Sequence, residues 1–312
     1  MTLAVCPNLA VDRVVRVDRL EPGTTMRAHM LQHQAGGKGA NVVRAVKALG
    51  GRAELVGFAA GDTGRLIGEL ATAEGLDVLL VVCDGEARVS TVVLELGGGH
   101  TELYEYGPRI TADDEKSFVA AVRHQRAGRG EWAVVDGSPP PGASAHFFAS
   151  LVEVLHANGY PVLLDATGVQ LVNALPARPE LAKVNLAEAH TAVGTAGDDL
   201  AGAYAACQGL VAAGAGGAIV TLAADGAVGL IEGRRLRATT EPVEAVNPCG
   251  SGDCFAAALL YGLERKDKIE AALAAATGVA AANAASPLTA HFDAKLAAHL
   301  TAAATVESAP SD

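Results

Sequence analysis

The residues best suited to chemistry in this sequence form one glycine-rich stretch toward its C-terminal end. It reads Asn247-Pro248-Cys249-Gly250-Ser251-Gly252-Asp253-Cys254 and leads directly into an apolar-periodic helix. Glycines let backbone amides approach an anion closely, and a helix start leaves unpaired N–H groups and a partial positive charge of about 0.5. The stretch therefore predicts a phosphate site to which Gly250, Ser251, Gly252 and Asp253 present their amides.

Asp253 lies in the first turn of that helix, where two interpretations stay open. A carboxylate there can cap the helix or offset its dipole, or it can take a proton from a substrate hydroxyl. Other glycine loops fail on spacing, because residues 250–253 lack the third glycine of a dinucleotide loop and Lys38 is not followed by Ser or Thr. Cys249 and Cys254 bracket the motif, and we interpret them as small buried packing residues.

A second glycine turn, Gly-Gly-Lys-Gly at residues 36–39, leads into another apolar-periodic helix. It brings backbone donors, Lys38 and Asn41 to one helix start, although a tight turn with a solvated lysine would show the same pattern. Two such helix starts, far apart in the sequence, suit a reaction that must bind two polar partners.

Composition excludes several classes of partner. The 312 residues carry 35 acidic and 24 basic side chains, so the formal net charge of −11 gives no long-range attraction for nucleic acid or anionic membrane. Without a basic leader or about 18 consecutive apolar residues, a signal peptide or membrane span is not expected, and we predict a soluble, cytoplasmic protein. The five cysteines show no zinc or paired CxxC spacing.

Hydrophobic patterning predicts an α/β fold. Apolar runs such as residues 133–135, 161–164 and 218–221 alternate with helical stretches such as 143–158 and 199–213. This alternation indicates βαβ units around a parallel sheet with helices on both faces. We assign residues 1–9, 33–85 and 108–312 to this core, and expect the aperiodic end, residues 305–312, to fray.

Residues 10–32 and 86–107 break the rhythm with extended segments and turns, which predicts a small β-sheet standing off the core. A sheet with one uncovered face needs a ligand, a lid role or a partner subunit to hide its apolar side.

Together, the two glycine motifs resemble the signatures of the ribokinase-like (PfkB) carbohydrate kinases, in the same order and over essentially the whole chain. Asn8 and Asp12 with their spacing, residues 105–108 (Glu-Tyr-Gly-Pro) and residues 137–142 (Gly-Ser-Pro-Pro-Pro-Gly) resemble its phosphosugar branch, which includes tagatose-6-phosphate kinase and 1-phosphofructokinase. The resemblance implies a three-layer αβα sandwich with a β-sheet lid. It also implies ATP- and Mg²⁺-dependent phosphorylation of tagatose 6-phosphate, fructose 1-phosphate or fructose 6-phosphate.

The resemblance also implies roles for individual residues. Sugar hydroxyls and the substrate's own phosphate would be held by Asp12, Gly37, Asn41, Lys38, Arg88, Ser138 and Arg27. The nucleotide would be contacted by Lys183, Asn185, Thr221, Ala223, Gly226, Gly252 and Asn283. Asn185 and Glu188, three apart at a helix start, would also reach Mg²⁺ or its waters, although an asparagine there is commonly a helix cap.

Four positions depart from the family pattern. Leu9 and Val184 stand in place of prolines, Ala223 in place of a glycine, and Thr25 where some relatives carry a lysine that holds phosphate. None of these changes removes a group that the transfer step requires.

Phosphoryl transfer depends mainly on alignment and neutralisation of charge. We predict that Asp253 accepts the proton of the attacking hydroxyl from about 2.6 to 3.2 Å. The small sheet would close over the sugar, and its uncovered face would form a homodimer.

Two alternatives stay open. In a kinase of an unphosphorylated sugar or nucleoside, Lys38, Arg88 and Ser138 would not converge on one pocket. A non-catalytic sugar- or nucleotide-sensing protein would not turn over ATP. Glycine spacing disfavours a dinucleotide-dependent oxidoreductase.

Overall fold

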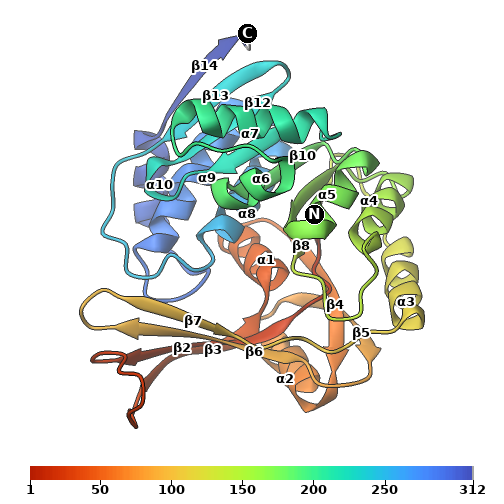
Figure 1. Cartoon of the computed structure of the whole chain (residues 1–312), viewed down its shortest axis with the longest axis vertical. Coiled ribbons are helices and arrows are strands. Elements are labelled where there is room, and N and C mark those ends of the chain that lie inside the picture. The colour runs from red at the N-terminus through yellow and green to blue at the C-terminus, as the bar shows by residue number, and fades with distance from the viewer. Residues whose placement is uncertain (311–312) are drawn as a thin grey trace.

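Two β-sheets of different size organise the chain, and the computed structural model describes residues 1–310 (Figure 1). The larger sheet has ten strands in the order β14 (Thr305–Pro310), β13 (Arg234–Thr239), β12 (Ala227–Ile231), β11 (Ala218–Thr221), β10 (Leu181–Asn185), β9 (Val162–Ala166), β8 (Ala133–Gly137), β1 (Thr2–Val5), β4 (Ala53–Ala60) and β5 (Asp77–Cys83). Strands β5 to β11 in this order run parallel, whereas β12, β13 and β14 are antiparallel additions at one edge.

Helices cover both faces of the large sheet, which confirms the predicted fold class. They are α1 (Lys38–Ala48), α2 (Gly61–Ala73), α3 (Ala112–Arg123), α4 (Phe147–Ala157), α5 (Gly168–Ala174), α6 (Leu186–Val193), α7 (Leu200–Ala212), α8 (Ser251–Glu264), α9 (Ile269–Ala284) and α10 (Ala294–Ala303), with 3₁₀ turns η1 (Leu175–Ala177) and η2 (Ala223–Asp225). No helix in residues 1–310 is long and apolar enough to cross a bilayer.

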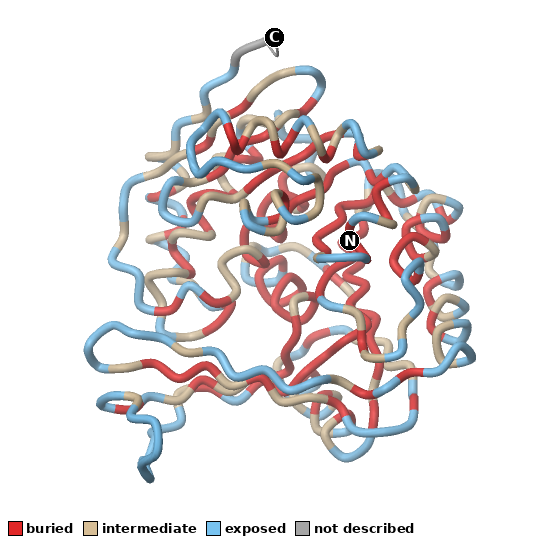
Figure 2. The backbone as a smooth tube through the Cα atoms, in the orientation of Figure 1, coloured by how far each residue is buried: buried red, intermediate tan, exposed pale blue. Residues whose placement is uncertain are grey.

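Alternation along each strand separates two hydrophobic cores, one on each face of the sheet. In β1, Ala4 packs with α1, α8 and α9, whereas Leu3 and Val5 pack with α3, α4 and α7. Figure 2 shows the result, with the central strands buried and the outer faces of the helices exposed. Because both faces are covered, the strands consist almost wholly of apolar residues.

The smaller sheet lies at the end of the molecule opposite β14 (Figure 1). Its strands follow the order β3 (His29–Gly36), β2 (Ala10–Val17), β6 (Arg88–Glu95) and β7 (His100–Tyr104), with β2 and β6 parallel. Strand β3 continues to Gly36, past the boundary predicted at residue 32, so it runs directly into the glycine turn before α1.

The end of the chain differs from the prediction. Residues 305–310 form β14, which pairs antiparallel with β13, so the expectation that they fray is wrong. Residues 311–312 lie outside the described residues. Val306 packs half-buried against the core on the α8 and α9 face, whereas its neighbour Glu307 is exposed. Pairing with a strand some 70 residues earlier leaves little local signal in the sequence.

This pairing predicts different effects of two neighbouring substitutions. Val306→Asp should lower the free energy of unfolding by about 1 to 3 kcal/mol, because it puts a charge against the core. Glu307→Gln, on the exposed side of the same strand, should change it by less than about 0.5 kcal/mol. Chemical denaturation measures both values, and two equally neutral substitutions would contradict the pairing.

Candidate active site

The carboxyl ends of three adjacent parallel strands place charged side chains in a row. Asp136 at the end of β8 is in register with Asp165 at the end of β9, and Lys183 of β10 donates to Asp165 Oδ2 at 2.6 Å. All three side chains are buried. This edge of an open α/β sheet is where ligands commonly bind.

The two glycine motifs start α1 and α8 directly above this row. Gly37 before α1 and Gly250 before α8 have φ values of 94° and 80°, in the region that favours glycine. Lys38 Nζ donates to Asp253 Oδ1 at 2.8 Å and lies 3.1 Å from Asp165 Oδ2. The structure therefore brings together two motifs that lie more than 200 residues apart in the sequence.

Asp253 points toward α1 rather than back onto its own helix. Gly250 is the N-cap of α8 without any side-chain cap bond, so the helix-cap interpretation is wrong. The Asp253 carboxylate, 4% exposed, accepts from Lys38 at Oδ1 and from Asn41 Nδ2 at Oδ2, the latter at 2.9 Å. One cationic and one neutral donor therefore hold the two oxygens of the Asp253 side chain.

Asp12 reaches the same region from β2 of the small sheet. Burial raises its pKa to about 6, with Asp253 adding to the rise and Arg44, Arg88 and the Gly37 amide opposing it. Only glycine fits at residue 36, because a Cβ there would overlap the Asp12 carboxyl group. Near neutral pH, Asp12 is therefore mostly ionised and sensitive to its cationic neighbours.

The residues expected to hold the substrate's own phosphate fall into separate groups. Arg88 Nη2 donates to the Asn8 carbonyl at 3.3 Å, and Asn8 Nδ2 donates to Ser138 Oγ at 3.3 Å. Arg88 and Ser138 thus meet around Asn8, whereas Lys38 is engaged by Asp253 and Asp165. Arg27 lies in the exposed loop between β2 and β3, apart from both groups.

Of the four amides predicted to face a phosphate at the start of α8, two are already hydrogen-bonded within the loop. The Ser251 and Asp253 amides donate to carbonyls of the same loop, those of Pro248 and Gly250. Among residues 1–310, no acceptor is found for the amides of Gly250 and Gly252. A Cβ on Gly252 would lie 3.3 Å from Lys183 Nζ, so the lysine ammonium group lies beside these amides.

Asn283, predicted to contact the nucleotide, is a buried side chain on α9 that contacts the loop before α8. It is 0% exposed, and its Nδ2 donates to the Cys249 carbonyl and to Ser251 Oγ, both at 3.0 Å. This amide supports the loop before α8 from beneath and leaves no surface for a nucleotide base to contact. Cys249 and Cys254 are buried free thiols, as predicted.

Asn185 and Glu188 form a reciprocal capping box at the start of α6. Glu188 N donates to Asn185 Oδ1 at 2.9 Å, and Asn185 N donates to Glu188 Oε2 at 3.0 Å. Within residues 1–310, no three His, Cys, Asp or Glu side chains are grouped to hold a metal ion. A Mg²⁺ ion fits here only if nucleotide phosphates and waters complete its ligands, as is common for this ion.

The remaining nucleotide-side residues lie in the turn between β11 and β12. Thr221 Oγ1 donates to the Val184 carbonyl at 3.4 Å, which joins β11 to β10. Ala223 has φ of 52°, a conformation that suits the glycine it replaces better than alanine. Gly226, with φ of 84°, has no room for a side chain against the Ala238 carbonyl.

Sequence reasoning named Asn8 only as part of a motif, and it missed four charged residues in and around the site, namely Arg44, Glu74, Asp136 and Asp165. Asp136 and Asp165 each follow an apolar run at the end of a buried strand, a signal that could have identified them. Arg44 and Glu74 left no local signal, because charged residues on a helix and at a helix end are usually solvated.

The surroundings of Asp136 and Asp165 shift the pKa values of these two buried carboxyl groups in opposite directions. Burial raises the pKa of Asp136 well above its usual value, and the nearby Asp253 and Asp165 add to the rise, against the effect of Lys38. The buried Cys6 thiol is a hydrogen-bond neighbour of the Asp136 carboxyl group. For Asp165, Lys183 and Lys38 outweigh burial and hold its pKa below the usual value. Asp165 pairs with both Lys183 and Lys38, and Asp253 pairs with Lys38.

Known proteins resemble this chain over most of its length. The chain is 31% identical over 284 residues to 1-phosphofructokinase of Haloferax volcanii, covering 89% of this chain and 90% of that protein. It is 30% identical over 275 residues to 1-phosphofructokinase of Haemophilus influenzae, covering 88% of each. The structure of phosphofructokinase-2 from Escherichia coli superposes with a TM-score of 0.89 over 96% of this chain and 97% of that one, at 23% identity, a likeness of fold.

The pfkB family carbohydrate kinases match residues 1–295, a span that includes both glycine motifs and every residue of the charged cluster. Kinases of this family use ATP and transfer a phosphoryl group to an alcohol. With its two helix starts facing each other across Lys38 and Asp253, this chain belongs to the PfkB family of carbohydrate kinases.

Proposed function

We propose that this kinase phosphorylates a ketohexose that already carries one phosphate, giving a bisphosphate and ADP. Fructose 1-phosphate, fructose 6-phosphate and tagatose 6-phosphate are the candidate substrates. The observation that carries the proposal is the Asp253 carboxylate, held between Lys38 and Asn41 beside the amides of Gly250 and Gly252. The two curated relatives named 1-phosphofructokinase support a substrate that is itself phosphorylated.

Asp253 is the proposed general base. It takes the proton of the acceptor hydroxyl as that oxygen bonds to the γ-phosphorus of ATP and the bond from phosphorus to the bridging oxygen of ADP breaks. The Gly250 and Gly252 amides, with Lys183 beside them, would face the negative charge on the transferred group. Bound Mg²⁺ would neutralise charge on the nucleotide phosphates, with Glu188 and Asn185 as its proposed protein contacts.

The sugar side is proposed to use residues from both sheets. Asp12, next to Gly37, would accept hydrogen bonds from the sugar hydroxyl groups. Arg88 and Ser138 would bind the phosphate group that the sugar already carries. Arg27 would need to move inward to join them. On the other side of Asp253, Thr221, Ala223 and Gly226 would lie against the nucleotide.

One observation favours a second candidate, a kinase of an unphosphorylated sugar or nucleoside. Lys38 is held by Asp253 and Asp165 and does not join Arg88 and Ser138, so the phosphate group of the substrate would have one cation fewer. The substrate panel below distinguishes the two candidates.

An ATP-consumption assay with the three ketohexose phosphates, fructose, tagatose and a nucleoside tests the proposal. We expect kcat/KM for one ketohexose phosphate to exceed that for every unphosphorylated acceptor by at least about 100-fold. One or two charge-assisted hydrogen bonds to the substrate phosphate would account for this factor. Asp253→Asn should lower kcat about 10²- to 10⁴-fold, because it removes the base while keeping the shape.

Asp293→Asn is the matched control, since Asp293 caps α10 and asparagine caps equally well. Turnover of unphosphorylated acceptors alone would reject the substrate class. A fully active Asp253→Asn would reject the base, and absence of ATP turnover with any acceptor would favour the sensing alternative.

The raised pKa of Asp12 predicts an acid limit to sugar use. Its value of about 6 in the folded protein means that Asp12 is ionised at pH 7 to 8 and gains a proton as the pH falls through 6. We expect kcat/KM for the sugar to decline below that pH, because a neutral carboxyl is a weaker hydroxyl acceptor. Asp12→Asn should lower kcat/KM and remove this decline, the acid limb of the pH profile, between pH 5 and pH 8. If the acid limb persists in the variant, a group other than Asp12 causes it.

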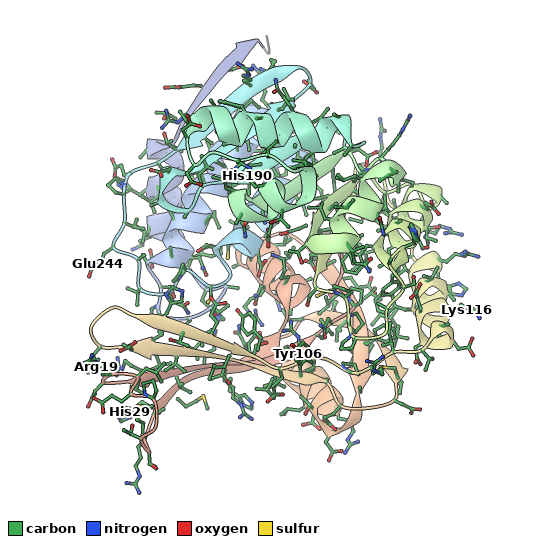
Figure 3. All side chains as sticks on the ribbon, in the orientation of Figure 1. Arg19, His29, Tyr106, Lys116, His190 and Glu244 are labelled. Carbon is green, nitrogen blue, oxygen red and sulfur yellow. The ribbon has the colours of Figure 1, made fainter. Side chains whose placement is uncertain are left out.

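We further propose that the small sheet acts as a lid and joins two subunits. Its inner side already contacts the core: the Cys249 thiol donates to Glu102 Oε1 at 2.6 Å, and Gln32 Nε2 donates to the Thr289 carbonyl at 3.2 Å. Large apolar side chains in and around the sheet are exposed, among them Met30, Leu103 and Tyr106, the last labelled in Figure 3. Such a surface is typical of an interface.

Sedimentation velocity should therefore find a dimer. Leu103→Lys, on β7, should convert it to a monomer, because a desolvated lysine in an apolar contact is costly. Val172→Lys, an exposed apolar position on α5 away from the small sheet, should leave the sedimentation coefficient unchanged. A monomeric wild-type protein at micromolar concentration would contradict this interface.

A further inference from the structure

We propose that Arg44 and Glu74 are positioning residues for the base, acting on Asp253 through the side-chain amide of Asn41; this rests on the proposed function of Asp253. Arg44 lies on α1, one turn after Asn41, and is 7% exposed. A buried guanidinium group so close to a reacting centre needs defined partners, because burying an unpaired charge is costly.

Three acceptors from three places hold the Arg44 guanidinium group. Nη1 donates to Asn41 Oδ1 at 2.9 Å, Nη2 to the Ala35 carbonyl at 2.6 Å, and Nε to Glu74 Oε2 at 2.7 Å. The planar fork of arginine matches such a set, whereas the single ammonium group of lysine does not.

Arg44 decides which end of the Asn41 amide faces the base. The two ends of an amide have nearly the same size and shape, so packing alone chooses poorly between them. Arginine has only donors, so the atom that faces it must be Oδ1, and Nδ2 must then point at Asp253 Oδ2, 2.9 Å away. Without the guanidinium group, the amide could turn and put its oxygen against the Asp253 carboxylate, where two acceptors would repel.

Glu74, directly after α2, extends the arrangement to the glycine turn. Its Oε2 accepts from Arg44 Nε, and its Oε1 accepts from the Ala35 amide at 2.9 Å. Both backbone polar groups of Ala35 are thereby held by this one charged pair. Ala35 directly precedes the glycines that start α1, so the pair also fixes the turn from which Lys38 projects.

Arg44 has a second, electrostatic effect that provides a separate readout. The groups that act on Asp12 are Arg44 of α1, Arg88 of β6, Asp253 of α8 and the Gly37 amide. After burial, Arg44 is the largest influence on the Asp12 carboxyl, and it favours the ionised form. Loss of its charge should therefore move the acid limb of kcat/KM to higher pH, an effect that loosened packing alone would not produce.

The first test compares two substitutions on α1. Arg44→Met should lower kcat by about 10-fold or more and move the acid limb of kcat/KM upward by about half a pH unit or more. Lys47→Met is the matched control: Lys47 ties the same helix to the Glu74 and Gly75 carbonyls and does not touch Asn41. It should keep kcat within about two-fold and leave the limb in place.

A double-mutant cycle then tests whether Arg44 acts through Asn41. In an Asn41→Ala background, Arg44→Met should lower kcat by less than about three-fold, because the amide that it orients is gone. Independent, multiplying losses would overturn the inference. So would an Arg44→Met enzyme whose kcat falls while its acid limb stays unmoved, since that result would leave only a structural role.

Two further variants keep the test decisive if Arg44→Met does not fold, as judged by circular dichroism and thermal unfolding. Arg44→Lys keeps the charge, so the acid limb should stay while kcat falls. Glu74→Gln keeps the shape and should lower kcat in the same direction by a smaller factor. Asp253→Asn distinguishes failure of the proposed base from failure of the positioning role. A fully active Asp253→Asn would reject Asp253 as the base. An inactive Asp253→Asn together with a wild-type-like Arg44→Met would reject only the positioning role of Arg44.

Discussion

A half-buried lysine shared by two buried carboxylates holds the charged cluster of this kinase together. Lys38 projects from the start of α1 and meets Asp253 from the start of α8 and Asp165 from the end of β9. Removing one member would leave an uncompensated charge among buried groups, which is why such clusters resist change one residue at a time. The positions of both glycine loops follow from this contact, because each loop must approach closely enough for the charges to meet.

Charge balance in this cluster also explains how an acidic protein can receive an anionic nucleotide. The formal net charge is −11, so the chain as a whole repels phosphate. At the site, Lys183 and Lys38 pair with Asp165 and Asp253, while burial raises the pKa of Asp136 well above its usual value. The amides of Gly250 and Gly252 add donors without adding a group that could titrate. A phosphate at this site would therefore meet lysines and amide donors, although the protein as a whole carries a net negative charge.

The small sheet contributes side chains to the candidate site. Strand β2 supplies Asp12, β6 supplies Arg88, and β3 ends in the turn that starts α1. Two hydrogen bonds connect the sheet to the core. Glu102 accepts from Cys249, which precedes α8, and Gln32 donates to Thr289, which follows α9. Movement of the sheet would therefore shift Asp12 and Arg88, the proposed sugar-binding residues, relative to Asp253, the proposed base.

The sequence by itself determined the parts of this protein whose signals are local. Glycine spacing before a periodic helix identified both helix starts, alternating apolar runs identified the α/β fold, and the resemblance to PfkB kinases agrees with the family match over residues 1–295. These features depend on backbone conformation and on burial of single elements, which neighbouring residues largely control.

Tertiary structure decided which of these parts meet. It brought Lys38 to Asp253 instead of grouping it with Arg88, placed Asn283 against the loop before α8, and paired residues 305–310 with β13. It also turned the Asn41 amide toward Asp253. Each outcome depends on the order of strands in the sheet and on hydrogen bonds between residues far apart in the chain. Such contacts form only when the whole core packs, so no local pattern of residue types records them.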